Sequence, residues 1–233
     1  MNGAIAIFVK TPGFSPIKTR LALELGDDRA LQFHRLSAAA VASVAQRAQG
    51  LRGMSVYWAV AEPEADALAQ WNGFPTLAQP PGGLGERMAR VHELLIARHG
   101  FGILIGADTP QLATHHLEQA RQWLSAPASR LALGRAQDGG FWFFGANVAP
   151  PLSAWDAVEY SVAGTAAALY SEMRTLGAWQ ELPVLTDADH ACDLPAVVQA
   201  LDALTGATPE QQALAAWIHG LAPRLPGHGM RRD

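Results

Sequence analysis

The sequence contains a single cysteine, Cys192, so it can neither close an internal disulfide nor supply a cysteine zinc cluster. A basic excess is also missing. The formal net charge is −4 and the isoelectric point is about 6.0, which argues against a general nucleic-acid-binding protein. No apolar run reaches the length that a bilayer span requires. Met1-Asn2-Gly3 leaves no room for a signal peptide before the first apolar run, so we expect a cytoplasmic protein without a membrane span.

Both common nucleotide fingerprints, the Walker A loop and GxGxxG, are absent as well. The lack of GxGxxG argues against a nicotinamide dehydrogenase. No internal repeat or linker interrupts the 233 residues, and 49% of them are hydrophobic. This length and composition predict one large α/β domain over residues 1–233.

A buried strand that ends in a carboxylate is predicted within residues 101–110. Positions 103–105 are all apolar, which is typical of a strand covered on both faces of a parallel sheet. Gly106-Ala107 then reduces the side-chain bulk, and Pro110 lacks the N–H that would continue the ladder. Open α/β sheets bind ligands at the carboxyl ends of their strands, so Asp108 is a candidate binding residue. A carboxylate that only caps the turn is the alternative.

An irregular loop with several cations follows the first predicted strand, residues 4–9. Two prolines and a glycine break regular structure there, and the loop carries Lys10, Lys18 and Arg20. Cations and hydroxyls in this position are suited to hold phosphate oxygens. A solvated basic loop is the alternative interpretation.

Apolar periodicity and capping residues predict the remaining elements. The expected helices span 27–47, 62–71, 84–100, 115–124, 162–176, 194–204 and 210–221, with Thr114 as the cap of the fourth. The expected further strands span 54–60, 74–77, 130–134, 141–145 and 180–185. We expect the terminal Arg231-Arg232-Asp233 to fray.

Two loop regions carry further candidate residues. The helix predicted after the Pro80–Gly83 break begins with Gly85-Glu86-Arg87, whose first-turn N–H groups can receive an anion. Asp138-Gly139-Gly140 lies between two apolar runs and predicts a hairpin or bend. The aromatic run 141–144 predicts a strand buried on both faces or one that lines a ring-stacking pocket, and core packing explains most of it.

Three acids follow the last predicted strand, namely Asp187, Asp189 and Asp193. Asp193 suits the first turn of the next helix, because carboxylates there interact favourably with the helix dipole. Asp187 and Asp189 therefore remain as candidate functional residues. The alternative is that they too only interact favourably with the start of that helix.

Five stretches in this order resemble the bacterial DUF2064 proteins, glycosyltransferase-like relatives of the 2-phospho-lactate guanylyltransferases. They are Phe8-Val9-Lys10 with Lys18-Thr19-Arg20-Leu21, Leu84-Gly85-Glu86-Arg87-Met88, Gly106-Ala107-Asp108-Thr109-Pro110, Asp138-Gly139-Gly140-Phe141, and Asp187-Ala188-Asp189 with Asp193-Leu194. The resemblance implies the nucleotide-diphospho-sugar transferase (GT-A-like) fold. In that fold a three-layer, mainly parallel mixed sheet binds a nucleotide across its carboxyl edge. It also implies that Asp108 holds Mg²⁺ or Mn²⁺ on the nucleotide's phosphates.

Two segments depart from the family pattern. His190-Ala191-Cys192 replaces the middle of the usual Asp-Val-Asp-Thr-Pro-Glu-Asp-Leu motif but leaves both carboxylates in place. Val158-Glu159-Tyr160-Ser161 stands where the family has Trp-Ser-Thr, on the acceptor side.

Magnesium and manganese sites commonly combine one or two carboxylates with substrate phosphates. Two strand ends of one sheet can present carboxylates across a single crevice. We therefore expect Asp189 to reach the same metal ion as Asp108, with Asp187 as its close competitor.

These residues predict a metal-dependent transferase that uses a nucleotide and a small-molecule acceptor, and no nucleic acid. The favoured reaction is glycosyl transfer, in which an acceptor hydroxyl attacks a nucleotide sugar and a nucleoside diphosphate leaves. The alternative is nucleotidyl transfer, in which an acceptor phosphate attacks a nucleoside triphosphate and pyrophosphate leaves. A non-catalytic nucleotide- or sugar-binding protein on the same fold is a third possibility, and an acceptor pocket beside the metal site would argue against it.

Each candidate residue has an expected role in this hypothesis. Catalysis is assigned to Asp108, with Asp138 or Glu159 as the base. The expected acceptor-binding residues are Asp138, Gly139 and Gly140. The expected nucleotide-binding residues are Lys10, Lys18, Arg20, Gly85, Arg87 and Asp108.

Overall fold

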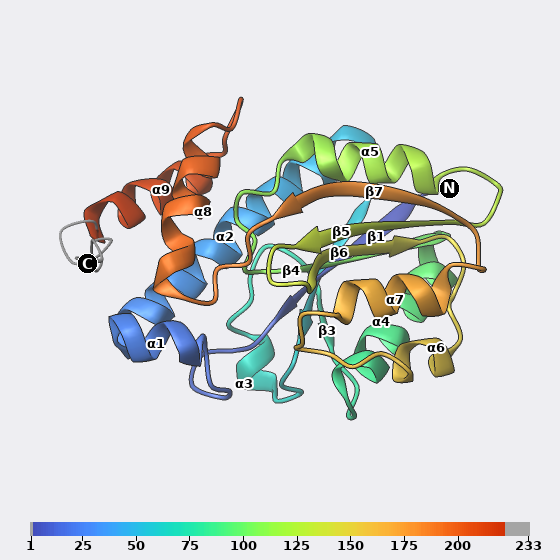
Figure 1. Ribbon diagram of the computed structural model, residues 1–233, viewed down its shortest axis with the longest axis horizontal. Coiled ribbons are helices and arrows are strands. Elements are labelled where there is room, and N and C mark those ends of the chain that lie inside the picture. The colour runs from blue at the N-terminus through green and yellow to red at the C-terminus, as the bar shows by residue number, and fades with distance from the viewer. Residues whose placement is uncertain (1, 222–233) are drawn as a thin grey trace, which may run out of the picture.

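A mixed sheet of seven strands, in the order β3-β2-β1-β4-β6-β5-β7, runs through the computed structural model, which describes residues 2–221 (Figure 1). The strands are β1 (Gly3–Val9), β2 (Ser55–Val60), β3 (Thr76–Ala78), β4 (Phe101–Gly106), β5 (Arg130–Ala136), β6 (Phe141–Ala146) and β7 (Ala178–Leu185). Strand β6 is antiparallel to β4 and β5, and the other neighbouring pairs are parallel. The predicted mainly parallel mixed sheet is confirmed, and the carboxyl ends of β1, β4, β5 and β7 share one edge.

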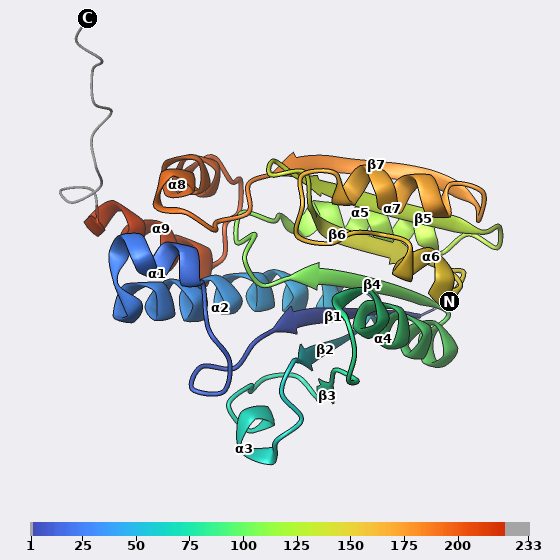
Figure 2. The ribbon, with the colours of Figure 1, turned by 60° about the horizontal axis from the view of Figure 1, so that its bottom comes forward.

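Side chains of the central strands alternate between two hydrophobic cores, as the period of two along a strand requires. On β1, Ile5, Ile7 and Val9 pack into one core, whereas Ala4 and Ala6 pack into the other. The first core is closed by α2 (Asp27–Arg52) and α5 (Thr114–Leu124). The second is closed by α4 (Leu84–His99), α6 (Leu152–Asp156) and α7 (Thr165–Met173), on the opposite side of the sheet (Figures 1 and 2).

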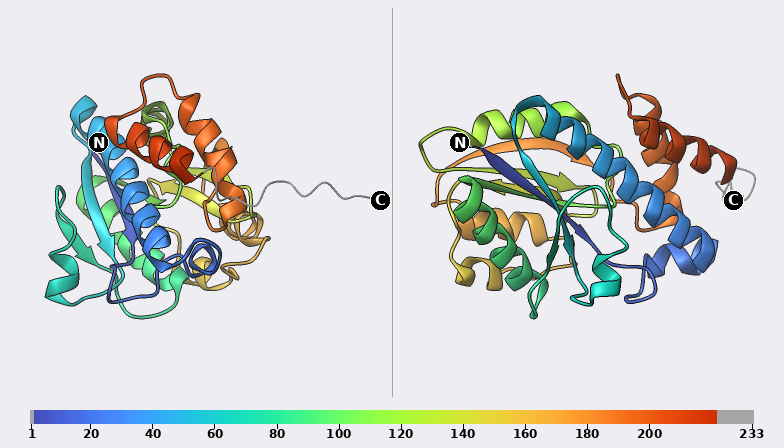
Figure 3. Two further views of the ribbon diagram at one scale, coloured as in Figure 1. Left: turned by 90° about the vertical axis from the view of Figure 1, so that its left-hand side faces the viewer. Right: turned by 180° about the vertical axis from the view of Figure 1, so that it is seen from behind.

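A third hydrophobic cluster lies beyond the carboxyl edge of the sheet. It joins α1 (Thr19–Leu25), α8 (Leu194–Asp202) and α9 (Pro209–Leu221) to the first half of α2. Seen from behind, α2 runs along the sheet and continues to this helical group (Figure 3, right). Leu21 is fully buried in the cluster, so α1 and the residue that precedes it are held beside the sheet edge.

Several predicted boundaries were wrong because contacts between distant segments override the local pattern. The helix expected over 62–71 is only α3 (Ala65–Leu68). Glu62, expected to open it, is instead buried and accepts the N–H of Thr11 at 2.8 Å. The helix expected from 162 begins at Thr165, after a left-handed Ser161.

Two short helices were not predicted, and two others differ at their ends. The loop expected to continue through Arg20 turns into α1 at Thr19, and α6 was missed altogether. Helix α2 continues past the expected 47 and ends before a left-handed Gly53. The cap of α5 is not Thr114 but Ala113, whose N–H donates to His116 Nδ1 at 3.2 Å.

The predicted fraying of 231–233 lies outside the described residues. Among residues 2–221, no helix combines the length and the apolar character that crossing a bilayer requires.

Candidate functional site

A cavity of about 600 Å³ opens at the carboxyl edge of the sheet. The loop after β1, the strand ends of β4 and β7, the turn between β5 and β6, and the first turn of α4 all contribute to its wall. Most of the predicted site residues therefore meet in one place, as the carboxyl edge of an α/β sheet predicts.

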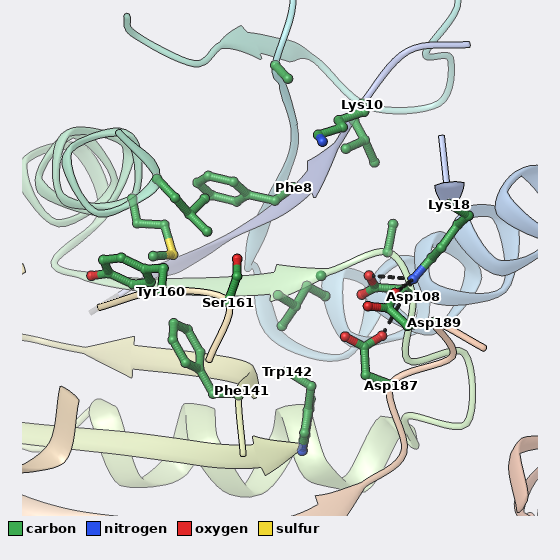
Figure 4. A pocket seen from close by; sticks show the side chains of 18 of the residues that line it. Phe8, Lys10, Lys18, Asp108, Phe141, Trp142, Tyr160, Ser161, Asp187 and Asp189 are labelled. Carbon is green, nitrogen blue, oxygen red and sulfur yellow. Dashed lines mark hydrogen bonds and ion pairs between the residues drawn. The ribbon is translucent and has the colours of Figure 1, made fainter. Parts of the chain in front are cut away.

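Asp108, Asp187 and Asp189 form an acidic cluster at one end of this cavity (Figure 4). One carboxylate oxygen from each lies within 4.8 Å of the others. Two strands separate β4 from β7 in the sheet, so the chain after β7 must cross back to reach Asp108. Gln111 Nε2 holds this crossing segment by donating to the Thr186 carbonyl at 2.7 Å, and the Ala188 N–H donates to the Asp108 carbonyl at 3.3 Å.

Small residues at the end of β4 leave the space that the Asp108 carboxylate occupies. A Cβ on Gly106 would lie 2.6 Å from Asp108 Oδ1, so only glycine leaves that space open. The Ala107 carbonyl accepts a hydrogen bond from Ser37 Oγ on α2 at 2.6 Å, which fixes the backbone beside the carboxylate.

The ammonium group of Lys18 lies inside the acidic cluster. Its Nζ is 2.9 Å from Asp108 Oδ2, 2.7 Å from Asp189 Oδ1 and 3.7 Å from Asp187 Oδ1. The Lys18 side chain is only 8% exposed. Its backbone is left-handed, with φ 41° and ψ 50°, immediately before α1 begins. Arg20 reaches the same cluster from outside, with its Nη1 3.1 Å from Asp189 Oδ2 and its own side chain largely exposed.

One lysine does not neutralise three carboxylates, and the pKa values reflect this. Burial lowers the pKa of Lys18, but the three surrounding carboxylates outweigh it and hold that pKa above its ordinary value. Burial raises the pKa of Asp108, and the nearby Lys18 ammonium more than offsets it, so the pKa of Asp108 lies below its usual range. Burial, together with the negative charge of Asp108, raises the pKa of Asp187 to about 8.

The chemistry of the cluster fits a divalent cation. Carboxylate oxygens are the ligands that Mg²⁺ and Mn²⁺ prefer. Asp187 Oδ1 is a buried oxygen for which residues 2–221 provide no hydrogen-bond donor. Both Asp187 and Asp189 share the cluster with Asp108, whereas Asp193 stands apart and accepts the N–H groups of Asp189 and His190 at 3.0 and 2.7 Å.

Aromatic side chains line the opposite end of the cavity. Figure 4 shows Phe8, Phe141 and Tyr160 there, together with Ser161 and away from the acidic cluster. Tyr160 Oη donates to the Trp155 carbonyl at 3.0 Å, which fixes the position of its ring. Ser161 has a left-handed backbone with φ 64°, an unusual conformation for a residue other than glycine.

The other predicted site residues divide between the cavity wall and its surroundings. Lys10, Arg87, Asp138 and Gly140 line the cavity. Arg87 Nε donates to the Gly82 carbonyl at 2.9 Å, and Asp138 Oδ1 accepts the Gly140 N–H at 2.8 Å.

Three predicted site residues lie outside the cavity lining. Gly85 packs behind the wall, where a Cβ would lie 2.7 Å from the Tyr160 ring. Gly139 supports the turn, with φ +89° and a carbonyl that accepts the Ala166 N–H at 3.0 Å. Glu159 is exposed, and no atom of it belongs to the cavity lining.

The aromatic run 141–144 divides between the cavity lining and the two hydrophobic cores. Phe141 and Trp142 line the cavity, whereas Phe143 and Phe144 are fully buried in the two cores. Trp142 also donates its Nε1–H to the Pro183 carbonyl at 3.0 Å, which ties β6 to the end of β7.

Several cavity residues were missed by the sequence reasoning, among them Phe8, His34, Gln79, Tyr160 and Ser161. His34 is buried, its Nε2 lies 3.0 Å from the Lys10 carbonyl, and its burial lowers its pKa. Phe8, Tyr160 and Ser161 lie in stretches compared with the family pattern, but no role was assigned to them. His34 and Gln79 lie outside those stretches, so no local motif marks them.

One usable signal was present in the sequence. Lys10 and Lys18 are the only lysines of the chain, all other Lys or Arg positions being arginine, and both lysines line the cavity.

Solved structures show where this architecture recurs. A proposed nucleotide-diphospho-sugar transferase from Desulfovibrio desulfuricans G20 superposes with a TM-score of 0.82 and 22% identity, covering 97% of this chain and 99% of that one. A cytidylyltransferase from Leptospira borgpetersenii serovar Hardjo-bovis (strain JB197) gives a TM-score of 0.51 and 13% identity over the whole of both chains. A CMP:2-keto-3-deoxy-manno-octonic acid synthetase complexed with CTP gives 0.50 and 12% identity, covering 88% of this chain and 100% of that one.

At these identities the similarity establishes the fold, which is that of the nucleotide-diphospho-sugar transferases, as the resemblance implied. No protein with a curated description matches the sequence. A family model described as "Uncharacterized protein conserved in bacteria (DUF2064)" matches residues 41–162. That match contains three of the five stretches that carry the resemblance, those around Arg87, Asp108 and Asp138. Because it covers more than half of the chain, the protein belongs to the DUF2064 family.

Proposed function

We propose that the protein is a metal-dependent transferase that binds a nucleotide sugar and transfers its glycosyl group to an acceptor hydroxyl. One observation carries this proposal: a single cavity has three carboxylates and a lysine at one end and aromatic rings at the other. Such a cavity matches a ligand that combines a diphosphate with ring groups. The wall beside the acidic cluster also holds Asp138, so the site offers an acceptor a base as well as space, which favours an enzyme over a simple binding protein.

The cations of the cavity would hold the diphosphate. Lys10, Lys18, Arg20 and Arg87 all line the wall formed by residues 10–20 and 84–88. Ionised donors form the strongest hydrogen bonds to phosphate oxygens. Asp108, Asp187 and Asp189 would hold Mg²⁺ or Mn²⁺, which when bound neutralises charge on the leaving diphosphate.

The wall formed by the loop segments around Asp138 and Tyr160 favours an uncharged acceptor. The lining residues from 138–142 and 160–165 include neither lysine nor arginine, so an acceptor phosphate would have no cation there. A hydroxyl needs only a base, and the exposed carboxylate of Asp138 is available. In the proposed step Asp138 takes the hydroxyl proton, the acceptor oxygen bonds to the anomeric carbon, and the bond from that carbon to the diphosphate oxygen breaks.

Binding and product analysis test this proposal together. The purified protein would be titrated calorimetrically with a panel of nucleotide sugars in Mn²⁺, and positive donors incubated with mixed sugars and alcohols. We expect binding of at least one nucleotide sugar and release of its nucleoside diphosphate. Asp108→Asn should abolish both. Failure of every nucleotide sugar to bind would overturn the proposal.

Nucleotidyl transfer is the second candidate, and two comparisons favour it. The structurally similar synthetase was solved with CTP, and another similar structure is a cytidylyltransferase. The product separates the candidates, because nucleotidyl transfer releases pyrophosphate from a nucleoside triphosphate, whereas glycosyl transfer releases a nucleoside diphosphate. The same incubations with the four common nucleoside triphosphates, assayed for pyrophosphate, would distinguish them.

A further inference from the structure

We propose that Lys18 is an internal counter-ion that occupies the place of the divalent cation, so that the metal ion enters only as the ammonium group leaves. This inference rests on the proposed function, because it assumes that the acidic cluster receives a metal ion with a phosphorylated ligand. It adds an exchange, in which Lys18 moves from the carboxylates to the incoming phosphates.

The first argument is the position of a single atom. Lys18 Nζ lies among all three carboxylates, with two oxygens at hydrogen-bond distance and the third at 3.7 Å. A divalent cation would need the same oxygens at about 2.0–2.6 Å. An ammonium nitrogen and a divalent cation repel each other strongly when both are partly buried. The side chain of Lys18 is nearly excluded from solvent, so the two cations compete for one place.

The second argument is the kind of residue found there. The chain uses arginine at every cationic position except Lys10 and Lys18. A guanidinium is a planar fork, whereas an ammonium is a compact point charge on a flexible four-carbon stem. Only the lysine can present one charged atom to three carboxylates and then withdraw it by rotating its side chain.

The third argument is that helix α1, which follows Lys18 directly, is held in place by contacts with two parts of the structure. Glu24 on α1 accepts the Ala191 N–H at 3.1 Å, and its other oxygen lies 2.8 Å from His190 Nδ1. Leu21 buries the same helix in the third hydrophobic cluster. Helix α1 is thus attached to the segment that carries Asp187 and Asp189, so the exchange needs only a movement of the Lys18 side chain. Figure 4 shows the Lys18 ammonium group beside Asp108 and Asp189. Because Lys18 also lines the cavity, a diphosphate bound in the same cavity would be within reach of the displaced ammonium group.

The exchange predicts that metal ion and diphosphate bind cooperatively. The free protein should bind Mn²⁺ weakly, because Lys18 must be displaced without a new partner. A diphosphate supplies that partner and so strengthens metal binding. By thermodynamic reciprocity the metal ion must strengthen diphosphate binding by the same factor.

The first test is a titration of the nucleotide-free protein with Mn²⁺, followed by electron paramagnetic resonance of the free ion. Lys18→Met removes the ammonium and keeps the length of the stem and the Cβ at the left-handed position. We expect it to tighten Mn²⁺ binding by at least about tenfold. Unchanged or weaker Mn²⁺ binding by this variant would overturn the proposal.

Arg20→Gln is the matched control. It removes the other cation of the cluster, which contacts Asp189 alone and from the exposed side. If the Lys18 variant acted only through a change in local charge, both variants would tighten Mn²⁺ binding by a similar factor. That result would also contradict the proposal that Lys18 and the metal ion compete for one place. We expect Arg20→Gln to alter Mn²⁺ affinity by less than about threefold, in line with an exposed ion pair.

A crystal structure of the unmodified protein with Mn²⁺ tests the exchange without any variant. We expect anomalous density within the acidic cluster and Lys18 Nζ withdrawn from Asp108 and Asp189. A metal ion bound there with both lysine contacts intact would refute the exchange.

A nucleotide titration separates this inference from the proposed function. With Mn²⁺ present, Lys18→Met should weaken nucleoside diphosphate binding by at least about tenfold and leave nucleoside binding unchanged. If Mn²⁺ binding tightens in the variant but no nucleotide binds the unmodified protein, the counter-ion role stands and the proposed function fails. If nucleotides bind and react while Mn²⁺ affinity is insensitive to Lys18, the proposed function stands and the counter-ion role fails.

Discussion

At the scale of single residues, some positions of the cavity matter for the space that they leave and others for the charge that they carry. Gly106 leaves the space into which the Asp108 carboxylate fits, and Lys18 supplies the charge that keeps that carboxylate ionised. Among residues 2–221, the Asp108 side chain forms a hydrogen bond to another side chain only with Lys18, at 2.9 Å, so its role in ligand binding should be separable from a role in folding.

Asp108→Asn should therefore abolish the Mn²⁺-dependent increase in melting temperature with nucleotide while changing the free energy of unfolding by no more than about 1 kcal/mol. Lys18 keeps its contact with Asp189 at 2.7 Å, and one of three like charges is removed. Differential scanning fluorimetry with and without ligand measures both effects. A large loss of stability in the absence of ligand would instead support the turn-capping role.

Gly139 and Gly140 offer a second test at this scale, because adjacent glycines differ in what surrounds them. A Cβ on Gly139 would lie 1.8 Å from the Ala163 carbonyl oxygen, at φ +89°. A Cβ on Gly140 would have the Asp138 carboxylate as its nearest neighbour, with Oδ1 at 3.1 Å. Gly139→Ala should lower the free energy of unfolding by at least about 2 kcal/mol, and Gly140→Ala by about 1 kcal/mol or less. Urea denaturation compares them, and equal losses would show that the turn tolerates no Cβ at either position.

At the scale of elements, the segment between β7 and α8 joins the sheet to the helical cluster. It crosses to Asp108 through Ala188 and to α1 through Glu24. Asp193, at the end of the 3₁₀ turn Ala191–Asp193, shapes this segment by accepting two consecutive N–H groups on one oxygen. Its contribution is therefore to position Asp189 rather than to touch a ligand.

Asp193→Ala should lower the free energy of unfolding by about 2 kcal/mol, because two backbone donors lose a charged acceptor. It should also weaken Mn²⁺ binding, because Asp189 loses its fixed position. Asp193→Asn keeps an acceptor oxygen and serves as the control, with less than half of either effect expected. Paired urea melts and Mn²⁺ titrations measure the two effects. Normal metal affinity in Asp193→Ala would show that the segment holds its shape without this residue.

At the scale of the whole molecule, buried histidines lie on both sides of the sheet, and burial lowers the pKa of two of them to about 4. His92 on α4 has its Nε2 3.2 Å from the Gly102 carbonyl, and burial lowers its pKa to about 4. His116 on α5 accepts the Ala113 N–H, and burial, followed by the charge of His115, lowers its pKa to about 4 as well. Both histidines are neutral in the folded protein at pH values where an exposed histidine, with a pKa near 6.5, is already protonated.

These two histidines should therefore make stability fall as the pH falls from about 6.5 to 4, because each binds a proton there in the unfolded chain but not in the folded protein. Asp187, whose pKa is raised to about 8, has the opposite effect but is a single group against two. Each histidine contributes at most about 1.4 kcal/mol per pH unit within this window. Urea melts between pH 4.5 and 7.5 should show this slope in the unmodified protein and a smaller slope in a His92→Gln, His116→Gln double variant. Identical slopes would remove the histidines as the cause.

The sequence by itself determined the elements and the residues that could act. Periodicity of apolar side chains predicted β1, β4 and the helices α4 and α9 close to their observed bounds, because which face of an element is buried depends on neighbouring residues along the chain. The carboxylates at the ends of β4 and β7 were also visible, because a strand end is a local feature. The same reasoning failed for α1 and for the helix expected from Glu62, where a contact with Thr11, far away in the sequence, decided the outcome.

Only the tertiary structure decided which of these residues meet. Asp187 and Asp189 reach Asp108 because the chain after β7 crosses two strand ends and is held there by Gln111. Lys18 enters the cluster because α1 packs against α2 and the chain before it turns left-handed. Tyr160, between α6 and α7, reaches the cavity because Gly85 on α4 has no side chain. Each of these contacts joins segments that are distant along the chain. Packing of the hydrophobic cores brings such segments together, and the local sequence pattern does not show which of them will meet.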